Sequence, residues 1–469
     1  MKIKFGTDGW RAIIADGYTF ENVRRVAEGT GRFMQEQGME KVVIGYDCRF
    51  QGQAFSELVA GVLGSMGIQV VLNNATFVST PMVSYAVHHL KADLGIVITA
   101  SHNPPTYSGF KLKSRHGGPS IPAEVAAVED RIPDAPVVQV LTLEELEQKK
   151  LLHCKDLESI YIDKVRDSFD LQAIHDSGLK IAYDAMYGAG QRAVRRLFPD
   201  AHFLHCEHNP SFHGQAPEPI DRNLQELAAT IRNNPGQYDV GLAHDGDADR
   251  IGMYDENGNF VDSHHILLLL LEYLYQYKKI KEKVIVTFSV TNKVKQLAEM
   301  YGLDVETTKV GFKYIAQRMQ ETDILVAGEE SGGIAVTGYI PERDGIWIAL
   351  VIFEYMAKSG QSLTQLIQNI YDKVGPFTFD RDDLHISSEK KEMILEHLRS
   401  HPVNQFGDRK IAQSEDLDGF KYTLDNGDWV MIRPSGTEPV LRVYAQSESR
   451  ESVKDLLNTV HDTLHAIES

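Results

Sequence analysis

The stretch LGIVITASHNPP, residues 94–105, joins an apolar run to a loop of polar residues and two prolines. The run from Leu94 to Ile98 predicts a buried strand. Pro104 and Pro105 cannot donate to a sheet ladder, so the strand must end before them, and the backbone N–H groups of the loop are left to hold an anion. We therefore interpret Ser101 as a candidate nucleophile on a rigid platform, with a simple structural turn as the alternative.

Helices and strands alternate around this stretch. The pattern predicts a helix between Thr19 and Gly38, a strand over residues 41–46, a helix over 55–66, a strand over 69–72 and a helix after Pro81. The outline recurs twice, with strand pairs at 179–183 and 238–243 and at 284–288 and 324–327. This order is typical of α/β layers, so we expect three similar α/β domains with mixed, largely parallel sheets.

The pattern changes after Gly375-Pro376. Residues 420–424 and 429–432 alternate like strands, and the Asp-Asn-Gly-Asp sequence between them is a strong hairpin signal. A closing helix over residues 451–467 completes an α+β unit. We predict domains at residues 1–150, 151–255, 256–372 and 376–469, the first three α/β and the last α+β.

Composition sets limits on the function. At 469 residues the chain is too long for one core, and its 42% hydrophobic and 24% charged residues are typical of a globular protein. A net charge of −18 without a Lys/Arg-rich tract argues against nucleic-acid binding. Cys48, Cys154 and Cys206 are too few and too far apart for a disulfide framework or a zinc site. With no signal core or membrane-spanning run, we expect a cytoplasmic protein without a membrane partner.

Three acidic residues follow the predicted strand 238–243. Asp245, Asp247 and Asp249 alternate along the chain, an arrangement that gathers hard oxygen ligands around Mg²⁺ or Ca²⁺. An EF-hand is one alternative, because Glu256 falls at its twelfth position, but Arg250 stands where that loop needs glycine. A solvated acidic turn is the other alternative.

Two further loops carry groups suited to a sugar phosphate. The carboxylates in residues 328–333 are flanked by glycines and can accept vicinal sugar hydroxyls, although a flexible turn would look similar. Residues 433–439, followed by Arg442, offer guanidinium groups, hydroxyls and a glycine, which favours a phosphate site over ordinary surface arginines. Because ligands gather at the carboxyl ends of strands in open α/β sheets, we expect one cleft shared by the domains.

Histidines elsewhere give weaker signals. His202, His205, His208 and His213 lie in a stretch that contains Asn and Pro, and we interpret this stretch as a solvent-exposed surface loop. The pair His264-His265 precedes an apolar run, and we expect it to cap or pack a core helix without a chemical role.

Four loops in this order resemble the α-D-phosphohexomutase family, which includes phosphoglucomutases and phosphomannomutases. Residues 99–105 resemble its phosphoserine loop, 245–250 its metal loop, 328–333 its sugar loop and 433–437 its phosphate loop. Smaller matches are found at residues 6–11, 109–111 and 310–313. The resemblance covers nearly the whole chain and implies a heart-shaped, four-domain isomerase with a central cleft, which interconverts hexose 1-phosphates and 6-phosphates.

The resemblance also implies roles for individual residues. Ser101 would carry the phosphoryl group and, with Asp245, Asp247 and Asp249, hold Mg²⁺. The implied catalytic residues besides Ser101 are His102 and Lys111, which assist proton transfer, and Arg11 and Arg250, which with Lys111 neutralise charge. The implied substrate-binding residues are Glu329, Ser331, Val310, Gly311 and Arg343, and the implied phosphate-binding residues are Arg433, Ser435, Gly436, Thr437 and Arg442. Glucose 1,6-bisphosphate would be the activator, and no protein partner is implied.

The sugar loop favours glucose, with mannose as the other possibility. Dual-specificity and glucosamine-specific relatives usually end this loop with histidine, whereas Gly333 stands here, and residues 341–347 resemble phosphoglucomutases. Reorientation of a bisphosphate would need a mobile last domain, so we predict a hinge near Gly375-Pro376.

Three other functions remain open. The alternatives are a sugar-1,6-bisphosphate synthase and a non-catalytic protein that binds calcium or a sugar phosphate. A serine hydrolase ranks last, because no Gly-x-Ser-x-Gly elbow surrounds Ser101.

Overall fold

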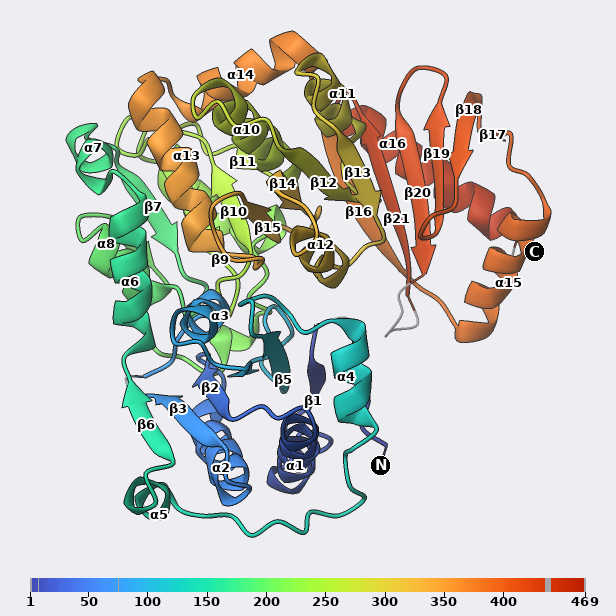
Figure 1. The fold of residues 1–469 in the computed structure, drawn as a ribbon. Coiled ribbons are helices and arrows are strands. Elements are labelled where there is room, and N and C mark those ends of the chain that lie inside the picture. The colour runs from blue at the N-terminus through green and yellow to red at the C-terminus, as the bar shows by residue number, and fades with distance from the viewer. Residues whose placement is uncertain (1, 7, 75, 435–439, 468–469) are drawn as a thin grey trace.

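Four sheets follow one another along the chain in the computed structural model, which describes residues 2–6, 8–74, 76–434 and 440–467 (Figure 1). We call the parts of the chain built around them units I to IV. The first three sheets mix parallel and antiparallel pairs and are covered by helices, and the fourth is antiparallel. The predicted class, three α/β units and a C-terminal α+β unit, is confirmed.

Unit I holds the strand that ends at the Ser101 loop. Its sheet has the order β1-β5-β4-β2-β3-β6, in which β4, β2, β3 and β6 are parallel. Its elements are β1 (Trp10–Ile13), α1 (Phe20–Glu36), β2 (Lys41–Tyr46), α2 (Gly52–Ser65), β3 (Gln69–Asn73), α3 (Thr80–His89), β4 (Leu94–Ile98), β5 (Tyr107–Ser114), α4 (Pro122–Glu129), α5 (Leu143–Gln148) and β6 (Leu152–Lys155). The Thr19 hydroxyl caps α1 by accepting the Asn22 N–H. Strand β6 lies beyond residue 150 and still belongs to this sheet.

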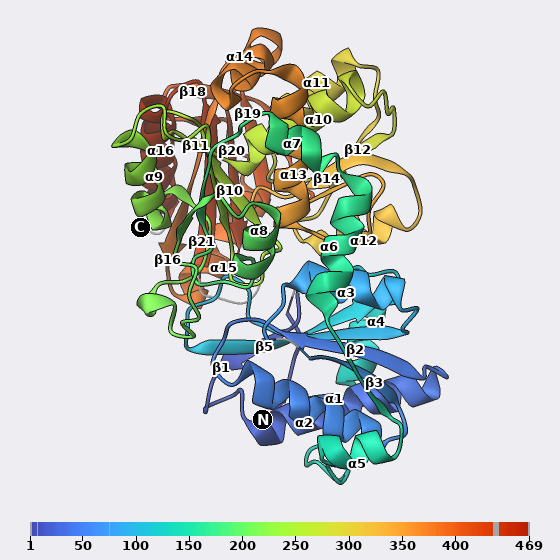
Figure 2. The same ribbon diagram turned by 90° about the vertical axis from the view of Figure 1, so that its left-hand side faces the viewer.

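Unit II supplies the acidic loop between two antiparallel strands. Its sheet has the order β11-β10-β9-β7-β8. Its elements are α6 (Leu157–Ser168), α7 (Leu171–Asp176), β7 (Ile181–Asp184), α8 (Gln191–Leu197), β8 (His202–Leu204), the 3₁₀ turns η1 (Phe212–Gly214) and η2 (Asp221–Asn223), α9 (Gln225–Arg232), β9 (Val240–His244), β10 (Ile251–Tyr254) and β11 (Phe260–Val261). Helix α6 packs against α3 and so ties unit II to unit I (Figure 2).

Units III and IV complete the molecule. Unit III has the sheet order β13-β12-β14-β15 and contains α10 (Ser263–Gln276), β12 (Lys283–Thr287), α11 (Asn292–Met300), β13 (Val305–Thr308), α12 (Phe312–Met319), β14 (Ile324–Gly328), β15 (Ile334–Val336), α13 (Gly345–Ser359) and α14 (Leu363–Val374). Unit IV has the order β16-β21-β20-β19-β18-β17 and contains β16 (Thr378–His385), α15 (Ser388–Ser400), β17 (Gln405–Phe406), β18 (Arg409–Glu415), β19 (Phe420–Leu424), β20 (Trp429–Pro434), β21 (Val440–Ser447) and α16 (Arg450–Ile467).

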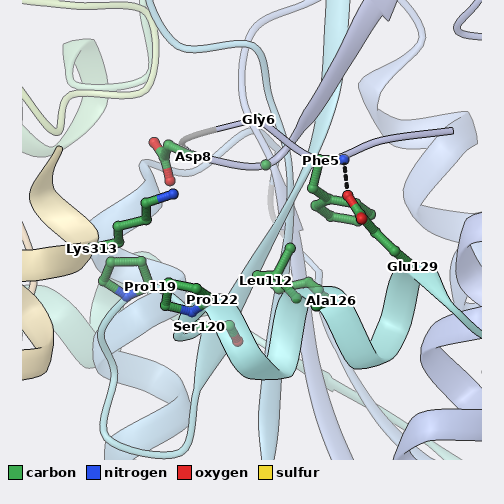
Figure 3. A pocket seen from close by; sticks show the side chains of 12 residues that line it. Phe5, Gly6, Asp8, Leu112, Pro119, Ser120, Pro122, Ala126, Glu129 and Lys313 are labelled. Atoms are coloured by element: carbon green, nitrogen blue, oxygen red, sulfur yellow. Dashed lines mark hydrogen bonds between the residues drawn. The ribbon is translucent and has the colours of Figure 1, made fainter. Parts of the chain in front are cut away.

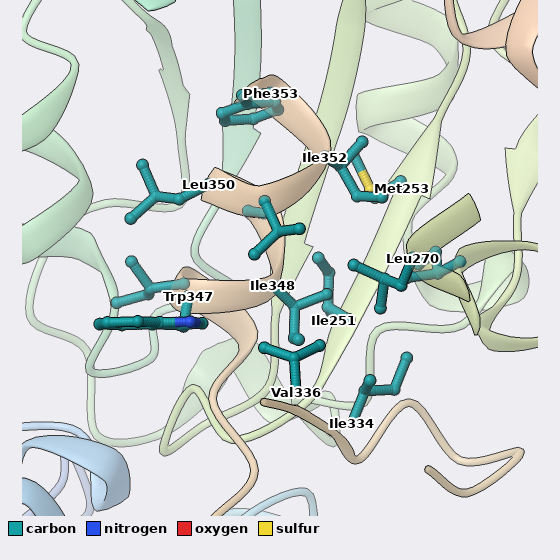
Figure 4. Close-up of a cluster of buried hydrophobic side chains, with 14 of the residues drawn as sticks. Ile251, Met253, Leu270, Ile334, Val336, Trp347, Ile348, Leu350, Ile352 and Phe353 are labelled. Atoms are coloured by element: carbon teal, nitrogen blue, oxygen red, sulfur yellow. The ribbon is translucent and has the colours of Figure 1, made fainter. Parts of the chain in front are cut away.

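One hydrophobic core runs through units I, II and III, and helix α13 lies inside it. The apolar side chains of α13 pack among residues of β10, α10 and β15 (Figure 4): Ile251, Met253, Leu270, Ile334 and Val336 against Trp347, Ile348, Leu350, Ile352 and Phe353. Unit IV has its own core between its sheet and the helices α15 and α16. We conclude that the shared core fixes units I to III, and hence the loops they carry, relative to one another. Within the described residues, no helix has the length and apolar character needed to span a bilayer.

Candidate active site

The Ser101 loop begins where β4 ends, as predicted. Ser101 is 1% exposed and has a φ of 52°, a left-handed conformation that a residue with a side chain adopts only where its surroundings impose it. Its N–H donates to Thr99 Oγ1 at 2.9 Å, and the Thr99 hydroxyl donates to Asp47 Oδ2 at 2.5 Å. The loop is therefore anchored to Asp47, the residue that follows the neighbouring strand β2.

Arg49 makes more hydrogen bonds to the same loop than Thr99 does. Arg49 was not predicted from the sequence. Its guanidinium donates to four backbone carbonyl oxygens of the loop, those of Ser101 at 2.6 Å, Asn103 at 2.7 Å, Pro104 at 2.9 Å and Tyr107 at 2.9 Å. Arg49 is 2% exposed. The available signal was its position just after a parallel strand, at the sheet edge where the Ser101 loop lies.

The acidic loop of unit II faces Ser101. Carboxylate oxygens of Asp245, Asp247 and Asp249 lie within 4.8 Å of one another, and all three residues are buried. Ser101 Oγ donates to Asp245 Oδ2 at 2.7 Å. The loop joins antiparallel strands β9 and β10, so the helix–loop–helix surroundings of an EF-hand are absent here.

This triad fits a hard divalent cation. The Oδ1 atoms of Asp247 and Asp249 are buried and receive no hydrogen bond from the described residues. Buried oxygens without a donor are costly, and a metal ion can satisfy them. Burial and the neighbouring carboxylates raise the pKa of Asp245 well above its ordinary value, because three negative charges in one place repel each other.

Lys111 from β5 supplies a cation to the triad. Its Nζ lies 2.8 Å from Asp247 Oδ2 and 3.0 Å from Asp249 Oδ2. Burial alone would lower the pKa of Lys111, but Asp247, Asp249 and Asp8 raise it above its ordinary value. These three carboxylates thus favour the positively charged form of Lys111.

His102 lies beside the nucleophile with a neutral ring. Its Nδ1 is 3.4 Å from Ser101 Oγ. Burial, together with Arg250, Arg11 and other nearby cations, holds the pKa of His102 well below its usual range. The imidazole is therefore neutral and has a nitrogen that can accept a proton, and its lowered pKa makes it a weak base.

Arg11 and Arg250 contact the Ser101 loop and the metal loop, respectively. Arg11 Nη1 donates to Asn103 Oδ1 at 2.6 Å, and the Arg250 N–H donates to Asp245 Oδ1 at 3.0 Å. The Arg250 guanidinium is 4.0 Å from Glu218. Both predicted cations therefore lie next to the Ser101 and metal loops.

The sugar loop is joined to the metal loop through the backbone. Arg250 pairs with Gly333 in an isolated antiparallel bridge. Gly332 has a φ of 88°, and a Cβ there would lie 2.8 Å from the Ile251 carbonyl oxygen, so the close approach requires glycine. Burial raises the pKa of Glu329 to about 7, although Arg343 and Arg250 oppose the rise.

Arg343 connects the sugar loop with the triad. Its Nη2 is 2.8 Å from Asp249 Oδ2, and its Nη1 is 3.7 Å from Glu329 Oε2. Ser331 is partly exposed in the same loop. The predicted residues Glu329, Ser331 and Arg343 therefore lie together at the edge of the metal loop.

Val310, Gly311 and the arginines of unit IV lie where units III and IV meet. The Val310 N–H donates to Asp418 Oδ2 at 2.9 Å, and the same oxygen is 3.0 Å from Arg433 Nε. Gly311 is the N-cap of α12. Arg433 and Arg442 are direct cross-strand partners in β20 and β21. The predicted phosphate ligands Ser435, Gly436 and Thr437 lie outside the described residues.

The other histidines have structural partners. His205 Nδ1 lies 2.9 Å from Asp184, and His208 stacks on Phe77. His264 Nδ1 accepts the Thr291 N–H at 3.2 Å, and His265 lies 2.7 Å from Asp262 and 2.8 Å from the Tyr371 hydroxyl. Among the described residues, the aspartate triad is the only group of three with metal-binding geometry.

Comparison with known proteins agrees with this geometry. Models of the phosphoglucomutase/phosphomannomutase domains match the chain in order: domain I at residues 2–136, domain II at 159–258, domain III at 262–374 and the C-terminal domain at 395–462. The chain belongs to the phosphoglucomutase/phosphomannomutase family. As a phosphohexomutase, it is an isomerase.

The relatives of this phosphohexomutase are named after different sugar substrates. A phosphoglucosamine mutase of Methanococcus aeolicus is 30% identical over 91% of this chain and 92% of its own. A phosphoglucomutase/phosphomannomutase of Thermococcus kodakarensis is 28% identical over 97% and 96%. The crystal structure of a Thermus thermophilus protein provisionally named a phosphomannomutase superposes with a TM-score of 0.87, at 32% identity and 99% coverage of both chains.

Proposed function

We propose that the enzyme interconverts hexose 1-phosphate and hexose 6-phosphate, with glucose as the favoured sugar, through phosphorylated Ser101 and a bisphosphorylated sugar. The observation that carries this proposal is the position of Ser101 Oγ. It lies 2.7 Å from Asp245 of the triad and 3.4 Å from a neutral imidazole. Phosphoryl transfer depends mainly on positioning and charge stabilisation, and this site offers both.

Mg²⁺ is the cation that we propose for the triad. Asp245, Asp247, Asp249 and a phosphate oxygen on Ser101 would hold it, and when bound it neutralises charge on the transferred group. The unpartnered oxygens of Asp247 and Asp249 support this assignment. Aspergillus fumigatus N-acetylphosphoglucosamine mutase, 16% identical with a TM-score of 0.60, was solved with GlcNAc-6P and magnesium.

The first transfer exchanges one phosphorus–oxygen bond for another. The bond between phosphorus and Ser101 Oγ breaks while a bond forms between phosphorus and the sugar hydroxyl oxygen. We propose that His102 accepts the hydroxyl proton and returns it to Ser101 Oγ, its neighbour at 3.4 Å. Three carboxylates favour the protonated form of Lys111, so we assign it charge neutralisation and not the proton transfer that the resemblance also implies. The second transfer runs in reverse with the other phosphate.

Residues of units III and IV would hold the sugar and the phosphate group that does not react. Arg433 and Arg442 would bind the phosphate that does not react, and Glu329 would accept sugar hydroxyls. After the first transfer the sugar must turn, so the hinge near Gly375 remains part of the proposal. We further propose glucose 1,6-bisphosphate as activator; an A. fumigatus N-acetylphosphoglucosamine mutase variant was solved with this compound.

We base the glucose preference on Gly333, whose surroundings leave little space for a larger residue. A Cβ at this position would lie 2.5 Å from Arg343 Cδ and 3.0 Å from Glu329 Oε2. The histidine found here in dual-specificity relatives would therefore displace Arg343. The arrangement of the sugar loop thus supports the glucose-preferring type.

A competition experiment tests this function. Protein with Mg²⁺ and trace glucose 1,6-bisphosphate is given equal glucose, mannose and glucosamine 1-phosphates, and phosphorus NMR follows the three 6-phosphates. We expect glucose 6-phosphate to form first, and Ser101→Ala to form none. Equal rates for glucose and mannose would refute the sugar preference. No 6-phosphate from any sugar would refute the mutase activity.

A further inference from the structure

Three cations converge on one carboxylate next to the triad. Asp8 Oδ2 lies 2.6 Å from Arg343 Nη2, 2.8 Å from Lys111 Nζ and 3.5 Å from Arg11 Nη2. Asp8 belongs to the N-terminal segment, and Arg343 lies 335 positions later in unit III. The Asp8 carboxylate therefore joins two units at the edge of the catalytic site.

Two of these cations are shared with the triad. Lys111 Nζ contacts Asp247 and Asp249 as well as Asp8, and Arg343 Nη2 contacts Asp249 as well as Asp8. Each contact uses an Oδ2 atom, which leaves Oδ1 of Asp247 and Asp249 without a donor among the described residues. Lys111 and Arg343 therefore sit between Asp8 and the proposed metal ligands.

The local charge balance shows what Asp8 contributes. Removal of Asp8 takes one negative charge from the cluster of carboxylates and cations around the triad, and Lys111 and Arg343 then lose their acceptor outside the triad. Both effects would weaken the attraction of the triad for a divalent cation.

The backbone next to Asp8 passes very close to Lys111. Gly9 has a φ of 93°, and a Cβ there would lie 2.8 Å from the Phe110 carbonyl oxygen and 3.1 Å from Lys111 Cγ. Only glycine lets the segment approach Lys111 so closely. Asp8 and Lys313 both line a cavity of about 170 Å³ (Figure 3). The side chain of Asp8 is 17% exposed, so its replacement leaves no large void.

We propose that Asp8 is a positioning residue that sets the affinity of the aspartate triad for a divalent cation, by holding Lys111 and Arg343 from the side opposite the triad. This inference rests on the proposed function, which assigns the metal to the triad. It adds a fourth carboxylate that governs the site without being assigned as a ligand.

Calorimetric titration of Mg²⁺ into the full-length, unphosphorylated protein tests the role of Asp8. We expect Asp8→Asn to raise the Kd at least tenfold and Asp8→Glu to restore it to within about threefold of wild type. Asp16→Asn, an exposed carboxylate of the same segment, is the matched control and should leave the Kd unchanged. Thermal unfolding of each variant checks that it is folded.

A double-mutant cycle with Lys111→Met tests whether Asp8 acts by holding Lys111 in place or only by its own negative charge near the metal. If Asp8 acts through Lys111, the effect of Asp8→Asn shrinks at least threefold in the Lys111→Met background. An unchanged Kd in Asp8→Asn, or the same factor in both backgrounds, would overturn the role of Asp8 alone. If wild-type protein shows no binding heat that Asp247→Asn removes, the metal site of the proposed function fails, and this inference fails with it.

Discussion

Replacing Arg49 with methionine should loosen the Ser101 loop while leaving the rest of unit I intact. The substitution removes donors to the carbonyls of Ser101, Asn103, Pro104 and Tyr107. A hydrogen bond with one charged partner contributes about 1.5 kcal/mol or more. If water takes over about half of the carbonyls, the loss is about 3 kcal/mol, which is roughly a 100-fold increase in opening of the loop.

Hydrogen exchange of the loop amides measures this opening. The amides of Asn103 and Tyr107 donate within the loop, to the carbonyls of Ala100 and Pro104, and should exchange about 100-fold faster in Arg49→Met. Amides of β1 and α1 should change less than about twofold. Arg49→Lys, which keeps the charge but not the fork, should give an intermediate rate.

A matched control separates the clamp from the loss of an arginine in general. Arg32 forms an ion pair with Glu28 and has a side chain that is 39% exposed, so Arg32→Met should leave the loop unchanged. Unchanged exchange in Arg49→Met would refute the clamp. Equal acceleration throughout unit I would show that Arg49 supports the whole fold and not the loop.

Three further predictions concern other parts of the molecule. Burial lowers the pKa of His264 to about 4, so the native state favours the neutral ring. The free energy of unfolding should therefore be highest above about pH 6.5 and fall by about 3 kcal/mol as the pH is lowered from 6.5 to 4. His264→Gln should flatten that part of the pH dependence of thermal unfolding, and parallel curves would contradict the assignment. Gly333→Ala should lower kcat/KM for glucose 1-phosphate about tenfold, because its Cβ meets Arg343, and an unchanged value would show that Arg343 can yield. Lys421→Met removes buried bonds from unit IV to the carbonyls of Phe288 and Val290 and should speed hydrogen exchange over residues 288–292 about tenfold; unchanged exchange would show that the contact is dispensable.

Elements with strong local patterns could be predicted from the sequence. The strands Lys41–Tyr46 and Phe420–Leu424 have the expected bounds, because a continuous buried run defines the first and alternation before a turn defines the second. Strand β6 was not predicted. Its sequence LHCK has one buried residue and three exposed ones, as at the edge of a sheet, and carries little periodic signal.

Local patterns alone predicted the site only where its residues are neighbours in sequence, and the family resemblance supplied distant residues such as Lys111 and Arg343. Asp245, Asp247 and Asp249 stand in one short loop, so their spacing predicts a divalent-cation site, with an EF-hand and a solvated acidic turn as alternatives. Arg49 and Asp8 act through contacts with distant segments, over 52 and 335 positions, which a local pattern does not contain. Their roles follow from the order of the strands in the sheet and the meeting of units I and III.

Transfer of labelled phosphate from Ser101 tests the central claim most directly. Protein carrying ³²P on Ser101 is mixed with Mg²⁺ and an equal amount of unlabelled glucose 1-phosphate, and the reaction is quenched within one turnover. The account predicts that the label leaves the protein and appears in glucose bisphosphate and then in glucose monophosphate. Label that stays on the protein, or that leaves only as inorganic phosphate, would contradict it.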